Sequence, residues 1–219
     1  MEITSRIYAV GGSSESHPSD AAVYLIIGEG EAALVDAGTG MGTQRILDNV
    51  KQAGVSPDQI RYLFLTHCHY DHTGGAEEIR KLTGCRIIAH DLDADYLEMG
   101  DSSVTAARWY GAVMEPTRVD IRIDKSHDVL TVGGVEVNFY HTPGHSPGSS
   151  VLTVISDGLL VLFGQDVHGP LNDVLRSTRG DYVKSLEFLI SLEADILCEG
   201  HFGVYRGKEK IRKFIESFL

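Results

Sequence analysis

Three histidines and an aspartate lie within six positions at the end of an apolar segment, LFLTHCHYDHTGG, residues 63–75. They are His67, His69, Asp71 and His72. Imidazole nitrogen and carboxylate oxygen are the donors with which proteins bind zinc and similar divalent ions when no thiolate takes part. In an extended segment His67 and His69 point to the same side and can reach one ion, while Asp71 and His72, in the following bend, can face a neighbouring site. The spacing therefore predicts a metal centre.

Three more potential ligands follow other segments with the character of strands. They are His145 in TPGHSPG, Asp166 in FGQD and His201 in CEGHF. Seven such groups at one edge would be costly as core residues, because buried imidazoles and carboxylates need partners and the carboxylates repel one another. Divalent metal ions remove this conflict. Nitrogen and oxygen donors without thiolate suit Zn²⁺ best, with Fe or Mn as alternatives.

Apolar runs and turn residues predict the elements that must position these side chains. The runs in the first half of the chain that are typical of strands lie at residues 21–28, 31–38, 61–66 and 85–90. The third of them delivers the histidine motif at its end. A helix is expected to begin with Thr43 as N-cap and to end at Gly54. Residues 91–120 are expected to be irregular to helical.

The second half of the chain predicts strands and then helices. Gly133-Gly134 and Asp157-Gly158 are typical of tight hairpin turns. A strand is expected at residues 195–200, with His201 in the turn between that strand and the final helix. The two helices are expected to bury Val183, Leu186, Leu189, Ile190, Ile211, Phe214, Ile215 and Phe218. We expect two β-rich layers with helices on the outside and the polar residues along one edge.

Composition limits the classes of protein that need to be considered. The 219 residues carry a formal net charge of −12, which disfavours a nucleic-acid partner. We find no linker and expect a single domain over residues 1–219. No apolar segment approaches the roughly twenty residues needed to cross a bilayer, and no secretory signal is evident, so we expect a cytoplasmic protein. Cys68, Cys85 and Cys198 share no CxxC spacing and are expected to be free buried thiols.

The motif HCHYDH, together with TPGHSPGS, FGQD and CEGHF, resembles the metallo-β-lactamase superfamily. The resemblance covers essentially the whole chain and includes LVDAG, whose Asp36 corresponds to a residue that supports the site from behind its ligands. It implies an α/β (α+β) fold, the four-layer αβ/βα sandwich of that superfamily, with the site at the edge of the two sheets.

The resemblance also implies a role for each residue of the motif. His67, His69 and His145 would hold a first metal ion, Asp71, His72 and His201 a second, and Asp166 would bridge the two. The activity implied is that of a hydrolase in which a hydroxide shared by two divalent ions attacks the substrate. Asp71 is expected to be catalytic as well, because it can orient the hydroxide and pass its proton to the leaving group.

The ligand set narrows the choice of substrate. The best-known class of metallo-β-lactamases uses a cysteine in the second site, where this chain has Asp166, so antibiotic cleavage is not expected. The set is most similar to that of glyoxalase II and of lactonases, which implies a small ester, thioester or lactone as substrate. Two alternatives remain open, namely a phosphodiesterase or nuclease of the same superfamily and a non-catalytic protein that binds or senses a ligand through its metal ions.

Other residues have interpretations that only a structure can decide. His141 could hydrogen-bond to a metal ligand, and His168 could line the mouth of the cleft. Trp109, Tyr110 and Met114 could form an apolar wall over the site or pack in the core or at a homodimer interface. The serines of GSSES, residues 12–16, are expected to belong to a loop and not to act as nucleophiles. Glu193 and Glu199 are expected to lie on solvated faces.

Overall fold

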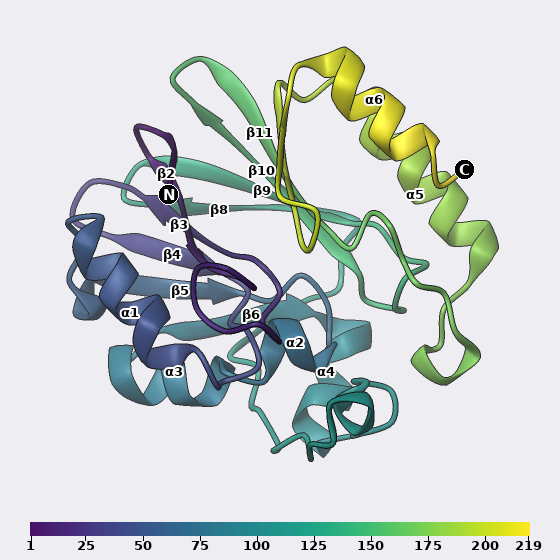
Figure 1. Ribbon diagram of the computed structural model, residues 1–219, viewed down its shortest axis with the longest axis horizontal. Helices are drawn as coiled ribbons and strands as arrows, with labels where there is room; N and C mark the ends of the chain where they lie inside the picture. The colour runs from purple at the N-terminus through teal and green to yellow at the C-terminus, as the bar shows by residue number, and fades with distance from the viewer.

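Two β-sheets lie face to face between outer helices in the computed structural model, which describes residues 1–219 (Figure 1). The first sheet contains β1 (Glu2–Thr4), β2 (Ile7–Gly11), β3 (Val23–Ile27), β4 (Ala32–Val35), β5 (Ile60–Phe64), β6 (Arg86–His90) and β7 (Ile121–Ile123), in sequence order. Its first four strands are antiparallel and its last four are parallel. The predicted strands at residues 21–28 and 31–38 are confirmed as β3 and β4, which form an antiparallel hairpin in which Leu25 faces Leu34.

The second sheet is formed entirely by the second half of the chain. It contains β8 (His127–Val132), β9 (Val135–His141), β10 (Ser150–Ser156), β11 (Leu159–Gln165), β12 (Ile196–Glu199) and β13 (Val204–Arg206), in the spatial order β13-β12-β11-β10-β9-β8. Both predicted hairpin turns are present. Gly133 and Gly134 have φ of 48° and 80°, and Asp157 and Gly158 have φ of 54° and 74°. Two successive positive φ values give the turn twist that matches paired strands.

The helices divide between the two outer faces (Figure 1). The first sheet is accompanied by α1 (Thr43–Gln52), α2 (Tyr70–Thr73), α3 (Ala76–Thr83) and α4 (Asp91–Met99), and the second sheet by α5 (Arg179–Ser191) and α6 (Lys208–Glu216). Three short 3₁₀ helices, η1 (Pro57–Gln59), η2 (Ala107–Tyr110) and η3 (Asp173–Leu175), lie in connections. None of these helices has the length and apolar character needed to cross a membrane.

Three apolar clusters hold the four layers together. One fills the space between the two sheets and includes Phe64, Phe139 and Phe163. The second packs α1 and α3 against the first sheet, through residues such as Ile46 and Ile79. The third packs α5 and α6 against the second sheet. Burial of these side chains supplies most of the driving force for the αβ/βα arrangement. The predicted four-layer fold is therefore confirmed.

Several boundaries differ from those expected. The short strands β1, β2, β7 and β13 were not predicted. Because of β13, His201 lies between β12 and β13 and not directly before the final helix. Thr43 is the first helical residue, and Gly42 takes the N-cap position. In α5 the buried residues are Tyr182, Leu186 and Leu189, while Val183 and Ile190 are half-buried. In α6 only Ile211 and Ile215 are buried, and Phe214 and Phe218 are half-buried.

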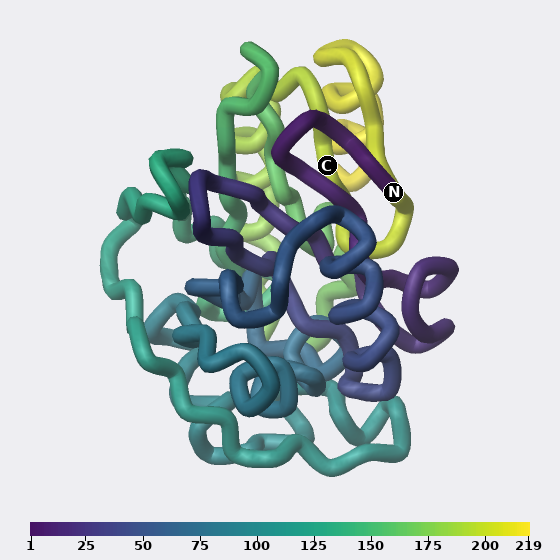
Figure 2. The backbone as a smooth tube through the Cα atoms, turned by 90° about the vertical axis from the view of Figure 1, so that its left-hand side faces the viewer, coloured from purple at the N-terminus to yellow at the C-terminus, as the bar shows by residue number.

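The two halves of the chain occupy different ends of the molecule. In Figure 2 the blue and teal backbone lies mainly in the lower part and the green and yellow backbone of the second half gathers at the top, while the purple N-terminal strands reach up beside the yellow segment. Strand β5 ends at Phe64, just before the histidine motif, and β11 ends at Gln165, just before Asp166. Chain segments that carry potential ligands thus arrive from both sheets at a common edge.

Candidate metal centre

The seven predicted ligands lie together at that edge, in two groups. In the first, ligand atoms of His67, His69, His145 and Asp166 all lie within 4.8 Å of one another, and in the second the same holds for Asp71, His72 and His201. Asp166 Oδ2 is 3.2 Å from His145 Nε2, and Asp166 Oδ1 is 3.0 Å from His72 Nε2 and 3.3 Å from His201 Nε2. The Asp166 carboxylate therefore lies between the two groups, one oxygen toward each.

The alternation expected for the histidine motif is present. The rings of His67 and His69 lie with their centroids 4.5 Å apart, both within the ligand cluster, while Cys68 between them is buried in the core beneath the first sheet. All three cysteines are buried free thiols, as expected. Asp71 and His72 lie in the short helix α2, which turns them toward His201. Asp71 Oδ2 is 3.2 Å from His201 Nε2.

Hydrogen bonds behind the rings orient three of the histidines. His145 Nδ1 lies 3.0 Å from the carbonyl oxygen of Pro170, which can only accept, so this nitrogen carries the proton. Thr66 donates its hydroxyl proton to Asp36 and can accept from His67 Nδ1 at 3.1 Å. His72 Nδ1 is 2.7 Å from Asp36 Oδ2. In each ring Nε2 is left to face the cluster, as in metal-binding histidines whose other nitrogen is hydrogen-bonded.

The buried nitrogens that face the cluster lack partners within the protein. His67 Nε2, His69 Nε2 and His145 Nε2 are buried and make no hydrogen bond. Leaving such an atom without a partner costs about 1–3 kcal/mol, so three converging cases require an explanation. Divalent ions would supply the missing partner for each lone pair. The donor set and its unsatisfied atoms thus fit metal ions.

Electrostatics divides the histidines into two kinds. Burial lowers the pKa of His67 well below its usual range and that of His69 to about 3, so both are neutral and have a free lone pair at pH 7. Burial also opposes the charged form of His72 and His201, but neighbouring carboxylates outweigh it. Asp166, Asp36 and Asp71 raise the pKa of His72 well above normal, and Asp166 and Asp71 raise that of His201 to about 10.

A cavity of about 240 Å³ opens onto the cluster. The potential ligands that line it are His69, Asp71, His145, Asp166 and His201. The remaining lining residues are Ala106, Trp109, Tyr110, His168, Pro170 and Leu175. This lining contains no serine, threonine, cysteine or lysine, so no side chain of the cavity offers the usual nucleophile for covalent catalysis.

Two aromatic residues of the 3₁₀ helix η2 line this cavity. Trp109 is 54% exposed and Tyr110 is 43% exposed, and both line it, whereas Met114 is buried in the core. The alternative of a wall over the site is therefore correct for the first two, and the alternative of core packing is correct for Met114. Burial and the nearby Asp71 carboxylate raise the pKa of Tyr110, which keeps its phenol protonated.

The expectation for His168 is confirmed, and the expectation for Glu199 is wrong. His168 lines the cavity, as expected, and its Nδ1 lies 2.9 Å from Glu199 Oε1. Glu199 was expected to face solvent, and this expectation is wrong because its side chain is fully buried. Its other oxygen accepts from the backbone amides of His201 and Phe202 at 2.6 and 2.8 Å, which holds the loop that carries His201.

His141 does not bond to a metal-ligand candidate. Its Nε2 lies 2.9 Å from the carbonyl oxygen of Pro147, and its ring stacks on that of His90 with centroids 3.7 Å apart. The suggestion that it orients a ligand directly is therefore wrong. It stabilises the loop between β9 and β10 instead, in which His145 lies.

Asp93 on α4 is a further buried carboxylate that sequence reasoning missed. One oxygen accepts from the amide of Cys68 at 2.8 Å and from the hydroxyl of Ser146 at 2.6 Å, and the other accepts from the amide of Gly148 at 2.6 Å. Asp93 thus ties the histidine motif to the loop of His145. Nothing in the acidic helix around it distinguishes Asp93 from exposed neighbours, whereas Glu199 stands two residues before His201 and that proximity was a usable signal.

Comparison with known proteins places this architecture in a family. The family model for the metallo-beta-lactamase superfamily matches residues 18–201. The chain is 30% identical over 138 residues to "Probable metallo-hydrolase MJ0888" of Methanocaldococcus jannaschii, which covers 63% of each protein. It is 27% identical over 231 residues to "Acyl-coenzyme A thioesterase MBLAC2" of Homo sapiens, covering 90% of this chain and 78% of that protein. Some matches cover less than two thirds of the relative. The match covers 63% of the Methanocaldococcus jannaschii protein and 55% of Rv2581c of Mycobacterium tuberculosis.

Solved structures agree on the fold. A metallo-beta-lactamase from Cronobacter sakazakii, a HARLDQ motif mutant, superposes with a TM-score of 0.82 at 21% identity, covering 100% of this chain and 92% of that one. BJP-1, a subclass B3 metallo-beta-lactamase of Bradyrhizobium japonicum, gives 0.81 at 24% identity, covering 100% and 89%. With the match of the family model over residues 18–201, these likenesses lead to one conclusion: the chain belongs to the metallo-beta-lactamase superfamily.

Proposed function

We propose that this protein is a metal-dependent hydrolase that cleaves a small ester, thioester or lactone with a water molecule as nucleophile. The observation that carries the proposal is the set of buried, unpartnered Nε2 atoms of His67, His69 and His145 beside a cavity that lacks any nucleophilic side chain. The thioesterase named among the relatives supports the same class of reaction.

The residues would share two divalent ions. His67, His69 and His145 would hold one ion, Asp71, His72 and His201 the other, and Asp166 would bridge them with its two oxygens, in keeping with the two groups of neighbouring ligand atoms. When bound, such ions lower the pKa of water toward neutrality and polarise a carbonyl oxygen. Zn²⁺ suits the nitrogen and oxygen donors best, and Fe or Mn are alternatives.

The protein's own groups have the remaining tasks. Asp71 lines the cavity, and although burial opposes its charged form, His72 lowers its pKa, so it is ionised and can accept a proton and return it to the leaving group. The walls formed by Trp109, Pro170 and Leu175 exclude water from an apolar acyl group. Tyr110 presents a protonated phenol that can donate a hydrogen bond to the substrate.

The net charge of −12 disfavours the phosphodiesterase or nuclease alternative. The exposure of Trp109 and Tyr110 would allow a homodimer, but both residues line the cavity, which favours a role toward a small-molecule substrate. A partner among nucleic acids or membranes is therefore not part of the proposal.

The test is a matched panel of substrates with the zinc-loaded protein. It contains a thioester, an aryl ester, an acyl-homoserine lactone and a bis-aryl phosphodiester, and initial rates are compared with those of His145→Ala. The exposed His127, which lies outside the site on β8, provides the control variant His127→Ala. We expect a carboxylic substrate to be turned over fastest, with the rate lost in His145→Ala and on chelation, kept in His127→Ala, and restored by added metal.

Two outcomes would overturn this proposal. Faster cleavage of the phosphodiester than of every carboxylic substrate would move the protein to the phosphodiesterase alternative. Saturable binding of carboxylic compounds without any product, at full metal occupancy measured by elemental analysis, would favour the non-catalytic alternative.

A further inference from the structure

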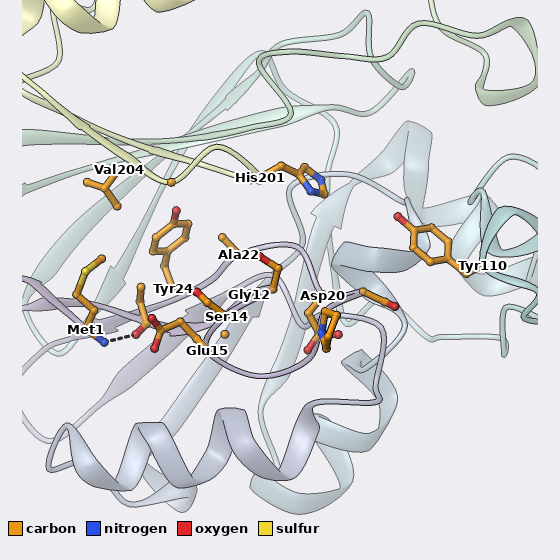
Figure 3. Close-up of a pocket in the computed structure, with 17 residues that line it drawn as sticks. Met1, Gly12, Ser14, Glu15, Asp20, Ala22, Tyr24, Tyr110, His201 and Val204 are labelled. Carbon is orange, nitrogen blue, oxygen red and sulfur yellow. Dashed lines mark hydrogen bonds between the residues drawn. The ribbon is translucent and has the colours of Figure 1, made fainter.

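A second cavity, of about 270 Å³, adjoins the one at the metal-ligand candidates (Figure 3). The two cavities share Tyr110 and His201 in their linings. The second is built mainly from the loop between β2 and β3, residues 12–22, and from the turn at residues 200–204. In Figure 3 Met1 and Tyr110 lie at its opposite ends, with the ring of His201 near the end that meets the first cavity.

The two linings differ in chemistry. The first cavity offers apolar surface from Ala106, Trp109, Pro170 and Leu175. The second offers the hydroxyl groups of Ser13, Ser14 and Ser19, none of which is hydrogen-bonded within the protein. Free hydroxyls on a cavity wall can bind an amide or hydroxyl group of a ligand at little desolvation cost, because they exchange one partner for another.

The charged groups of the lining determine which ligands this second cavity can accept. Neither lining contains a lysine or an arginine. The second contains the carboxylates of Glu15 and Asp20, and Asp20 is compensated by hydroxyl and amide donors from Ser16 and Thr39, not by a cation. Apart from His201, a proposed metal ligand at the end shared with the first cavity, the only cation of this lining is the ammonium of Met1, which lies at the end away from Tyr110 and donates to the carbonyl of Ala9. Between these two ends an anionic ligand group would lose hydration without gaining a partner.

We propose that the second cavity binds the leaving group of the substrate, and that this group is not anionic and carries an amide or hydroxyl function. The proposal rests on the proposed function and deepens it. The acyl group lies against Trp109 in the first cavity, and the scissile bond lies between Tyr110 and His201. Water adds its oxygen to the acyl carbon, the acyl–sulfur or acyl–oxygen bond breaks, and the leaving thiol or alcohol departs with the proton.

Three butanoyl thioesters with a common acyl group test the charge of the leaving group. The leaving thiols are N-acetylcysteamine, which is a neutral amide, 3-mercaptopropionate, which is an anion, and thiocholine, which is a cation. We expect kcat/KM to be about tenfold lower for the anionic thioester than for the neutral one, as for an unpaired charge in a partly desolvated site, whereas the carboxylates of Glu15 and Asp20 do not disfavour the cationic one. An anionic thioester that is cleaved as fast as the neutral one would overturn the proposal.

The position of the leaving group is tested by filling the cavity. Ser14 is exposed on the loop, so Ser14→Phe is compatible with folding and places a ring in the cavity. It should raise KM for the N-acetylcysteamine thioester by about tenfold and should have little effect on butanoyl methyl thioester, whose leaving group is too short to reach Ser14. Ser126→Phe, at an exposed position in the segment before β8, is the matched control.

Binding without turnover provides an independent measurement. Trp109 is the only tryptophan of the chain and lines the first cavity, so its fluorescence reports occupancy. The ketone in which CH₂ replaces the thioester sulfur cannot be hydrolysed, and its dissociation constant should rise in Ser14→Phe and not in Ser126→Phe. If no thioester is cleaved but this binding pattern holds, the hydrolase proposal fails and the cavity assignment is supported. Turnover with no effect of charge or of Ser14→Phe overturns the cavity assignment alone.

Discussion

At the scale of single residues, the donors that face the cluster were predictable and the groups behind them were not. The seven potential ligands stand in short motifs whose spacing and residue types are specific. Asp93, in contrast, acts on the backbone amides of Cys68 and Gly148, which are remote in sequence. Every residue has such an amide, so no side-chain pattern indicates which carboxylate will bind one.

Replacement of Asp93 tests whether it positions the ligands. In the parent protein, three donors bind the two carboxylate oxygens of Asp93, whereas the asparagine in Asp93→Asn has only one acceptor oxygen. The loops of His67 and His145 should therefore separate slightly. We expect metal affinity to fall by about 10–100-fold, as for residues that orient ligands from behind. The measurement is competition with a chromophoric chelator. Asp95→Asn, exposed on the same helix, is the control, and an equal affinity in both variants would contradict the role.

At the scale of elements, longer apolar runs were predicted well and short edge strands were missed. Strands β1, β7 and β13 have three residues each and lie at the edges of their sheets, so they present too few positions for an alternating pattern to be detected. Helix α4 shows a further limit. Its N-cap is His90, whose Nδ1 accepts from the amide of Leu92 at 3.3 Å, and histidine is not among the residues that usually signal a helix start.

The cap on α4 predicts a dependence of stability on pH. Burial, with a smaller contribution from His141, lowers the pKa of His90 from 6.5 to about 4. The unfolded chain therefore binds this proton first as the pH falls, so the stabilisation present above pH 6.5 is lost progressively toward pH 4. Protonation at Nδ1 would also remove the acceptor for the Leu92 amide.

The variant His90→Asn keeps a capping acceptor but cannot titrate. Between pH 7 and pH 5 its Tm should fall less than that of the parent protein, by about 2–4 °C, which corresponds to roughly 1 kcal/mol after allowance for solvent screening. Thermal denaturation of the zinc-loaded proteins at both pH values measures this difference. The exposed His127 on β8 provides a matched control, His127→Asn, and identical slopes for the parent and His90→Asn would refute the prediction.

At the scale of the whole molecule, the sequence predicts an apolar layer between the two sheets, but it does not predict which side chains of one sheet contact which side chains of the other. Phe139 on β9 and Phe163 on β11 belong to one buried cluster with Phe64 on β5 of the opposite sheet. The alternation along each strand shows which face is buried, yet the register of one sheet over the other depends on side-chain shape.

Truncation in this layer should destabilise the protein strongly. Phe139 has no exposed surface, and Phe139→Ala is expected to lower the free energy of unfolding by about 3–5 kcal/mol through lost burial and the cavity left behind. Ile155 on the neighbouring strand β10 is 61% exposed, and Ile155→Ala should change it by no more than about 0.5 kcal/mol. Urea denaturation of the two variants compares them, and similar losses would show that the layer is less tightly packed than described.

Metal removal should also act on the whole molecule, because the proposed ligands come from both sheets. Ions that bind only the folded state stabilise it by about 4 kcal/mol at a thousand times the dissociation constant. Chelation should therefore lower Tm, and added zinc should restore it. In His145→Ala the difference between the two states should be smaller than in the parent protein. A Tm that does not respond to zinc in the parent protein would contradict the proposed centre.

The division of the sheets between the two halves of the chain has a consequence for synthesis on the ribosome. All strands of the first sheet precede residue 124, and all strands of the second follow residue 126. A nascent chain can thus complete its first sheet, with His67, His69, Asp71 and His72 already in place, before any strand of the second exists. The last proposed ligand, His201, is translated only after strands β8 to β12 of the second sheet. A fragment that ends before residue 145 would therefore contain only His67, His69, Asp71 and His72 of the proposed ligands, and the proposed centre can be assembled only after the second sheet has been made.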